Sequence, residues 1–175
     1  DNAMNVKCSA GTGSLMDTLK AMFSLENIGD AYHMAQNAPR AYGINATCAV
    51  FLMENARRMQ AAGYRKDEIL ASCCYAIVEN MARSLWDQVE FPENTLIVLH
   101  GQTMRSDPLP LAVTKRAQEY LREKIHCLVP PLPGHRACIG LIDSMKDQQA
   151  DVKEFCQLDD LIQREFDKRI TLCRG

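Results

Sequence analysis

The stretch between residues 95 and 145 alternates strand-like and helix-like segments, and this alternation constrains the fold more than any other feature. Residues 95–99 and 125–129 are short, continuous apolar runs, a pattern typical of buried strands. A helical pattern at 108–121, opened by two prolines, separates them, and another follows at 137–145. Strand, helix, strand and helix at this spacing predict an α/β fold with a parallel sheet.

Three further helical patterns precede this alternation, so we expect a helix-rich protein. Apolar residues recur at helical spacing within 15–23, 48–62 and 66–88. The stretch 27–46 carries two glycines, a proline and three asparagines, which predicts a loop with one short helix. For the later helix at 108–121, the side chains predicted to be buried are Leu111, Val113, Ala117 and Tyr120.

Composition narrows the class of protein. The 175 residues are 47% hydrophobic and 24% charged, as in globular domains, and the net charge of −2 argues against nucleic acid or an anionic membrane as partner. No apolar run approaches the length of a membrane span, and no signal peptide is recognisable. The eight cysteines lack the spacing of a secreted disulfide scaffold. We therefore expect a cytoplasmic protein with reduced thiols, some of them metal ligands.

A glycine-rich turn stands before the first helical pattern, where residues 7–14 read KCSAGTGS. Gly11, Thr12 and Gly13 would place free backbone N–H groups at the positive end of the helix dipole, which predicts an anion site for phosphate. The pattern lacks the lysine ending of a P-loop and the span of a dinucleotide fingerprint, so an ordinary helix start is the alternative.

A second turn of interest follows the first predicted strand. Gly101, Gln102 and Thr103 stand at its carboxyl end, where open α/β sheets place ligands, although a strand-end turn needs a glycine in any case. Two cysteines, Cys127 and Cys138, fall in a predicted strand and a predicted packed helix, and we interpret both as core residues.

Two cysteine motifs carry a resemblance to a known family. Residues 5–13 (NVKCSAGTG) resemble the segment NDKCAAGTG of the 2-hydroxyacyl-CoA dehydratase activators and the related benzoyl-CoA reductase ATPase subunits. Residues 48–51 (CAVF) resemble the second motif of that family, CTVF, and Cys48 follows Cys8 by 40 residues, close to the family's spacing. The resemblance extends over residues 1–146.

The resemblance implies a member of the superfamily of acetate and sugar kinases, heat-shock chaperones and actin, whose two ribonuclease-H-like halves close over ATP and magnesium. Residues 1–146 are similar to the C-terminal half of such an ATPase domain without its first strands, and residues 147–175 would be a linker and tail helix leading to a further segment. Gly11 to Gly13 would contact the phosphates, and Gly101, Gln102 and Thr103 the adenosine. The chain alone would hydrolyse no ATP, because half of the cleft is absent.

In this family the two cysteines of each protomer, here Cys8 and Cys48, jointly hold one four-iron–four-sulfur cluster at a dimer interface, between two chains or between tandem domains. ATP hydrolysis there drives a low-potential electron into a CoA-ester dehydratase or reductase partner. Thiolates are the expected ligands of such clusters, and two from each subunit make four by symmetry. The resemblance therefore implies an iron–sulfur activase.

This sequence also departs from the family pattern. The adenosine turn, usually TGGVAQN, reads HGQTMRS at residues 100–106, and the aspartate before the family's lysine is Val6. These differences predict weakened or redirected nucleotide binding. Two alternatives follow from them: a degenerate, non-hydrolysing domain that serves as a dimerisation or docking scaffold, and a structural module whose thiolates hold a metal such as zinc.

Overall fold

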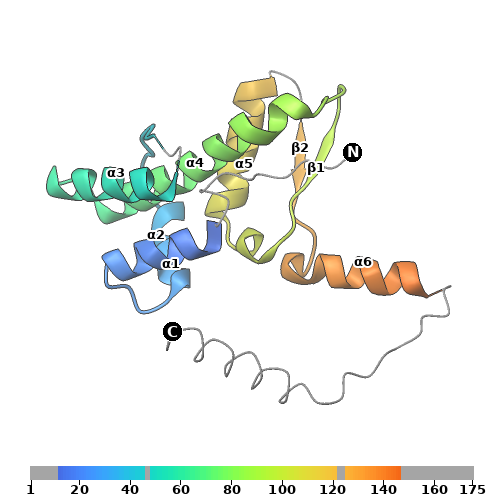
Figure 1. Cartoon of the computed structure of the whole chain (residues 1–175), viewed down its shortest axis with the longest axis horizontal. Coiled ribbons are helices and arrows are strands. Elements are labelled where there is room, and N and C mark those ends of the chain that lie inside the picture. The colour runs from blue at the N-terminus through green and yellow to red at the C-terminus, as the bar shows by residue number, and fades with distance from the viewer. Residues whose placement is uncertain (1–11, 46–47, 122–124, 147–175) are drawn as a thin grey trace, which may run out of the picture. The chain divides into compact units, whose positions relative to one another are not determined.

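The computed structural model describes residues 12–45, 48–121 and 125–146, drawn as the coloured ribbon in Figure 1. The chain divides into two compact units, one ending at Cys138 and the other starting at Ile139. The linker and tail helix predicted for residues 147–175 lie outside the described residues. The first unit contains both predicted turns and is the part that bears on function.

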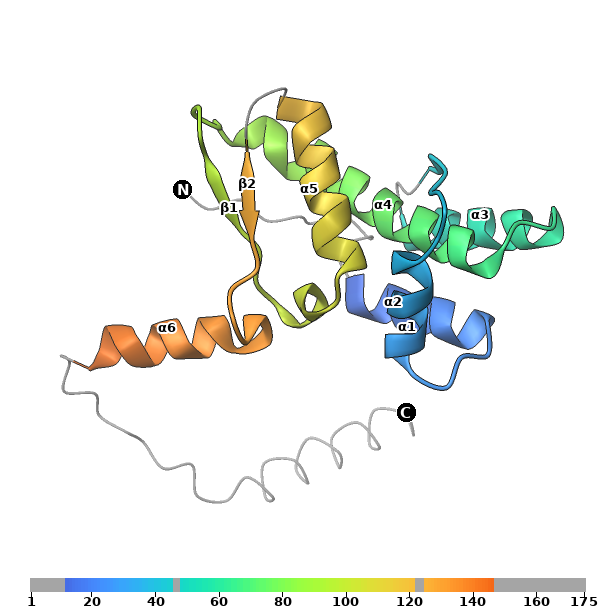
Figure 2. The ribbon, with the colours of Figure 1, turned by 180° about the vertical axis from the view of Figure 1, so that it is seen from behind.

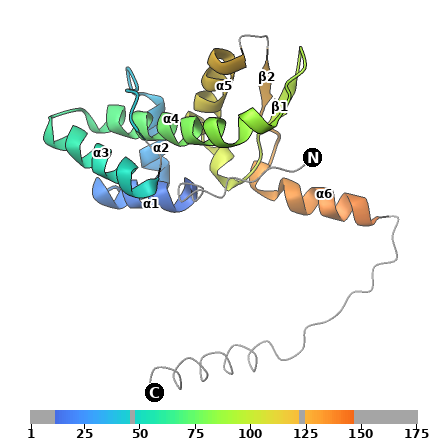
Figure 3. The same ribbon diagram turned by 45° about the horizontal axis from the view of Figure 1, so that its top comes forward.

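Helix α4 (Lys66–Leu85) is the centre of the first unit. It contacts α2 (Ile28–Gln36), α3 (Ala49–Ala61) and α5 (Pro108–Leu121), and α1 (Thr12–Met22) in turn packs on α2. Figures 1 and 3 show α3 alongside α4, with α5 crossing α4 near the sheet. The largest fully buried side chains are Met16, Leu19, Leu52, Ile69, Leu70, Leu109 and Val113. One hydrophobic core thus joins helices that are distant in sequence.

Local signals explain where these helices begin and end. The side chain of Asn27 accepts a hydrogen bond from the backbone N–H of Asp30 (3.0 Å), and the Asp30 carboxylate accepts one from the N–H of Asn27 (3.3 Å), a capping box that starts α2. Helix α3 ends just before Gly63, whose positive φ of 82° suits the turn after a helix. Helix α2 is the short helix that the sequence predicts within residues 27–46, and this prediction is confirmed.

The sheet consists of two parallel strands, β1 (Leu96–Val98) and β2 (His126–Leu128), paired in the register Leu96 with His126 and Val98 with Leu128. Figure 2 shows them beside α5. The middle residues, Ile97 and Cys127, face the core and are half-buried. On the other face Leu96, Val98 and Leu128 are about half exposed. The two strands are predicted to be buried, and this holds only for the face that carries Ile97 and Cys127 and lies toward α5.

Helix α5 has the predicted bounds but a different buried face from the predicted one. Val113 and Ala117 are buried as expected, whereas Leu111 is 60% and Tyr120 36% exposed. The buried stripe runs through Leu109, Val113 and Ala117 at intervals of four residues, and Leu111 lies two residues away from it on the opposite side of the helix. The two prolines fix where α5 begins, but they do not fix its rotation toward α4.

Helix α6 (Arg136–Met145) begins in the first unit, after the short 3₁₀ turn η4 (Pro133–His135), and continues into the second. Cys138 on this helix is exposed, so the interpretation of this thiol as a core residue is wrong. Within the described ranges, no helix combines the length and the apolar character that crossing a bilayer requires.

Candidate functional site: a cavity between two predicted turns

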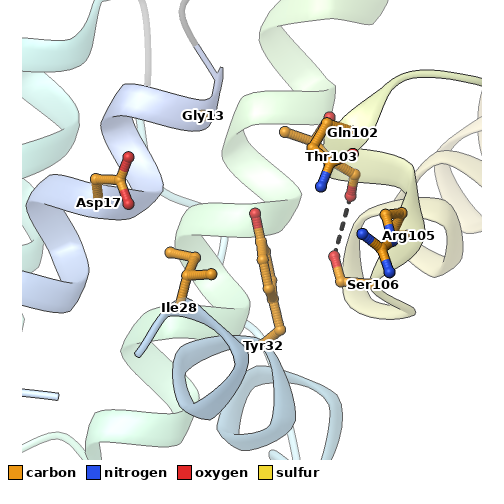
Figure 4. Close-up of a pocket in the computed structure, with 8 residues that line it drawn as sticks. All are labelled: Gly13, Asp17, Ile28, Tyr32, Gln102, Thr103, Arg105 and Ser106. Carbon is orange, nitrogen blue, oxygen red and sulfur yellow. Dashed lines mark hydrogen bonds between the residues drawn. The ribbon is translucent and has the colours of Figure 1, made fainter. Parts of the chain in front are cut away.

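A cavity of about 440 Å³ lies between the start of α1, helix α2 and the 3₁₀ turn η3 (Gln102–Arg105) that follows β1. Figure 4 shows the eight side chains or backbones that line it. The lining residues are Gly13, Asp17, Ile28, Tyr32, Gln102, Thr103, Arg105 and Ser106. Its volume is in the range of small-molecule sites, so a ligand of nucleotide size suits it.

The cavity brings together the two turns that the sequence singled out. A Cβ atom placed on Gly13 would lie 4.0 Å from Cγ2 of Thr103, although the two residues are 90 positions apart in the chain. Helix α1 begins at Thr12, so its first backbone N–H groups are at this end of the cavity. Gly11 lies outside the described residues, and so does the side chain of Thr12. The positive end of α1 therefore opens onto the turn that follows β1.

The turn after β1 has a defined conformation that requires its glycine. Gly101 has φ of 116°, in the region that side-chain-bearing residues rarely adopt, and its N–H donates to the carbonyl of Pro133 at 2.8 Å. The N–H of Met104 donates back to the carbonyl of Gly101 at 3.1 Å, and Ser106 Oγ donates to the carbonyl of Thr103 at 3.0 Å. These hydrogen bonds hold η3 at the carboxyl end of β1, the position that the sequence predicts for this turn.

Gln102 is positioned by a neighbour that the sequence did not indicate. Its side-chain oxygen passes over Gly134 so closely that a Cβ atom there would lie 2.2 Å from Oε1 of Gln102. The turn η4 thus supports η3 in two ways: by the hydrogen bond from Gly101 to Pro133, and by leaving room for the Gln102 amide. No helical or strand periodicity could have revealed this contact, because it joins two turns.

Helix α2 supplies an aromatic wall that sequence reasoning missed. Tyr32 and Ile28 are one helical turn apart, so both point to the same side of α2. Burial raises the pKa of the Tyr32 phenol above its usual value, with Cys74 and Asp17 acting in the same direction and a hydrogen bond with Ser106 opposing them. Tyr32 and Ser106 therefore bring α2 and the residue after η3 to the same cavity.

Two charged residues of opposite sign complete the cavity. Asp17 stands one helical turn after Gly13 on α1, and Arg105 stands at the end of η3. Both side chains are exposed, and among the described residues neither forms an ion pair. Figure 4 shows Asp17 and Arg105 on opposite sides of Tyr32. The cavity therefore has a carboxylate toward α1 and a guanidinium toward the far end of η3.

The predicted metal ligand Cys48 lies elsewhere, at the N-cap position of α3. Its thiol is free and half-buried, and its side chain makes no capping hydrogen bond. Cys8, its predicted partner, lies outside the described residues. Within the described part of the chain, no three metal-binding side chains gather into a cluster. In contrast, Cys73 and Cys74 on α4 are deeply buried, and burial raises the pKa of both thiols.

Comparison with known proteins decides the family. The model of the BadF/BadG/BcrA/BcrD ATPase family matches residues 1–141. The chain belongs to this family. It is 24% identical over 151 residues to a 2-hydroxyisocaproyl-CoA dehydratase activator from Clostridioides difficile, a match that covers 86% of this chain and 54% of the relative.

Two solved structures have the same fold. One is the activator of the 2-hydroxyisocaproyl-CoA dehydratase from Clostridium difficile with bound ADPNP, with a TM-score of 0.65 and 21% identity over 88% of this chain and 55% of that one. The other is component A of the (R)-2-hydroxyglutaryl-CoA dehydratase from Acidaminococcus fermentans, with a TM-score of 0.63 and 20% identity over 78% and 49%. The chain spans about half the length of the relatives it matches.

This member of the BadF/BadG/BcrA/BcrD ATPase family has the helix-rich α/β fold that the sequence predicts. The resemblance read from the two cysteine motifs is confirmed at the level of the family. The iron–sulfur cluster, the dimer and the individual site residues stay predictions.

Proposed function

We propose that this chain is the nucleotide-binding part of an ATP-dependent activase that acts on a CoA-ester dehydratase or reductase. The observation that supports this most is the meeting of Gly13 and Thr103 at one cavity. The turn predicted to bind phosphate and the turn that the resemblance assigns to adenosine border the same space, and the curated relative is a dehydratase activator.

The chemistry of the lining residues suggests which end of the nucleotide each of them would contact. Backbone N–H groups of Gly11, Thr12 and Gly13 would bind phosphate oxygens at the positive end of α1. Gln102 and Thr103 would contact the ribose or base from η3. Asp17, one turn into α1, offers the carboxylate oxygen that Mg²⁺ accompanying ATP prefers.

We further propose that Cys8 and Cys48 are two of the four ligands of an iron–sulfur cluster shared by two copies of the domain. The free, half-buried sulfur of Cys48 has suitable chemistry, because cysteine sulfurs are the usual ligands of iron–sulfur clusters. A cluster bound there would supply one-electron transfer to the dehydratase or reductase. Free thiols of this kind also fit the reducing cytoplasm.

Two measurements on the full-length protein test this proposal. Isothermal titration with MgATP should give saturable binding, and no binding would refute the nucleotide assignment. Anaerobic reconstitution with iron and sulfide should give four irons per pair of domains. Cys48→Ala should lower that iron content severely, whereas Cys138→Ala, which removes an exposed cysteine, should leave it unchanged. Equal iron in both variants would refute the cluster assignment.

A second candidate function is that of a docking scaffold that binds no nucleotide, and the side chain of Gln102 is the feature that favours it. In the family the adenosine turn has a second glycine, whereas this chain carries a long side chain there that crosses Gly134. If that side chain fills the space of the nucleotide, the domain binds no ATP, and its interaction with a partner protein is independent of nucleotide. Pull-down of the dehydratase component with and without MgATP separates the two functions.

A further inference from the structure

The segment between α2 and α3 is held against α4. Residues 37–45 are its described part, and the backbone N–H of Tyr42 donates to Oγ of Ser72 on α4 at 2.8 Å. Ser72 is fully buried, and its hydroxyl donates in turn to the carbonyl of Glu68 at 2.6 Å, so its oxygen has a fixed direction. The Tyr42 ring also packs edge-on against Tyr64, with 4.9 Å between the ring centroids. The segment therefore has a fixed course as it approaches α3.

Asn55 adds a further hydrogen bond close to Cys48. Its side-chain amide donates to the carbonyl of Asn45 at 2.8 Å, across ten positions of the chain. Asn45 stands three positions before Cys48, and Asn55 lies about two turns into α3. The carbonyl of Cys48 accepts a hydrogen bond from the N–H of Leu52 at 3.1 Å, which starts the helix. The chain is thus tied to α3 on both sides of Cys48, although residues 46 and 47 lie outside the described part.

The start of α3 has few other interactions that would fix the cysteine. Cys48 has the extended backbone of an N-cap residue, but its side chain makes no capping hydrogen bond of the kind that serine or asparagine makes there. Val50 and Phe51, which follow in the first turn, are 70% and 55% exposed, so packing against the core contributes little at these two positions. The sulfur is therefore available as a ligand, and its position depends on how the preceding backbone is held.

We propose that Asn55 is a positioning residue for Cys48, whose amide fixes the backbone before the cysteine and so sets where the sulfur stands relative to α3. This inference rests on the proposed cluster function and adds to it a residue that touches no atom of the cluster. Residues that orient a metal ligand from behind change the metal affinity when they are replaced. One hydrogen bond to a backbone carbonyl corresponds to about a fivefold change in the ratio of held to released segment.

Three variants of the full-length protein isolate this hydrogen bond. Asn55→Asp keeps the shape of the side chain and replaces the amide donor by a carboxylate oxygen, which cannot donate to the carbonyl of Asn45. Asn55→Ala removes the donor without adding a charge, and it keeps the test valid if the carboxylate disturbs folding. Gln60→Glu is the matched control, since it makes the same change from amide to carboxylate at an exposed position of the same helix.

The first measurement uses the cluster-free protein and follows the rate at which iodoacetamide alkylates Cys48, read by mass spectrometry of digests. Both Asn55 variants should raise this rate about fivefold, because a released segment exposes the half-buried sulfur. The rate at Cys138, an exposed cysteine in the same digests, should stay unchanged. The second measurement follows iron loss to a chelator after anaerobic reconstitution, which should be about fivefold faster in both Asn55 variants. Gln60→Glu should match wild type in both measurements.

The possible results separate this inference from the function on which it rests. Unchanged alkylation of Cys48 in both Asn55 variants would overturn the inference. A parallel rise at Cys48 and Cys138 would overturn it too, because it would show a general loosening of the fold. Faster alkylation with unchanged iron loss would also overturn it, since the position of Cys48 would then not matter to a cluster. Wild type that takes up no iron would refute the cluster function itself.

Discussion

Replacing Gly134 by alanine should displace the Gln102 side chain without removing it. The new Cβ atom would lie 2.2 Å from Oε1 of Gln102 and 3.4 Å from its Cα and Cδ atoms. The amide oxygen must therefore move by about 1 Å to reach an ordinary van der Waals separation. Only the far end of a flexible side chain has to move, so the free energy of unfolding should change by less than about 0.5 kcal/mol.

The effect on nucleotide binding follows from the proposed role of Gln102. If its amide makes one hydrogen bond to the nucleotide, losing that bond costs about 1 kcal/mol, or roughly fivefold in Kd. Titration of the full-length protein with MgATP measures this loss, and urea unfolding measures stability in parallel. Gly134→Ala should thus weaken binding about fivefold at unchanged stability.

A double-mutant cycle tests whether Gly134→Ala acts on nucleotide binding through Gln102. Gln102→Ala alone should weaken binding by about the same factor, and Gly134→Ala added to it should cost nothing further, because the atom that clashed is gone. Additive losses in the double mutant would show that Gly134 acts through something other than Gln102. Unchanged binding in both single mutants would show that Gln102 does not contact the nucleotide.

Three further outcomes test the fold and its thiols. Leu70→Ala should lower the free energy of unfolding by about 2–5 kcal/mol in urea, whereas the exposed Leu111→Ala should change it by less than about 0.5 kcal/mol; similar losses would contradict the assigned helix faces. Burial raises the pKa of Tyr75 to about 12, so the folded state keeps a proton that the unfolded state loses near pH 10. Stability should therefore fall as pH rises from about 10 to 12, and Tyr75→Phe should fall less steeply. Iodoacetamide should label Cys48 in the native protein and Cys74 only after unfolding, as mass spectrometry of digests would show; early labelling of Cys74 would refute its burial.

Most of the secondary structure could be predicted from the sequence because local signals mark it. Pro108 and Gly63 bound two of the helices, and the apolar period of 66–88 gave α4 to within a few residues. Which faces of the strands and helices are covered by other elements could not be predicted from local signals. The apolar run at 95–99 has the pattern of a strand buried on both faces, yet Leu96 and Val98 are exposed, because covering depends on elements distant in sequence.

The residues of the candidate site likewise fall into those that the sequence predicts and those that it does not. Gly13, Gly101 and Thr103 belong to motifs with a backbone requirement, so their positions at a helix start and a strand end were predictable. Tyr32 and Arg105 carry no such motif, since a tyrosine inside a helix and an arginine in a turn are both common. Only the tertiary structure, in which α2 and η3 border the same cavity, brings them together.

The half-covered sheet also affects how any oligomer of this chain should be judged. Leu96, Val98 and Leu128 form an apolar strip on paired strands, a surface that favours adventitious self-association. A larger apparent mass in gel filtration would then be no proof of a symmetric, cluster-bridged pair. A charged residue on the strip, such as Val98→Lys, should abolish this adventitious self-association while an iron-dependent dimer persists. If the substitution abolished the iron-dependent dimer as well, the strip would belong to the interface of that dimer.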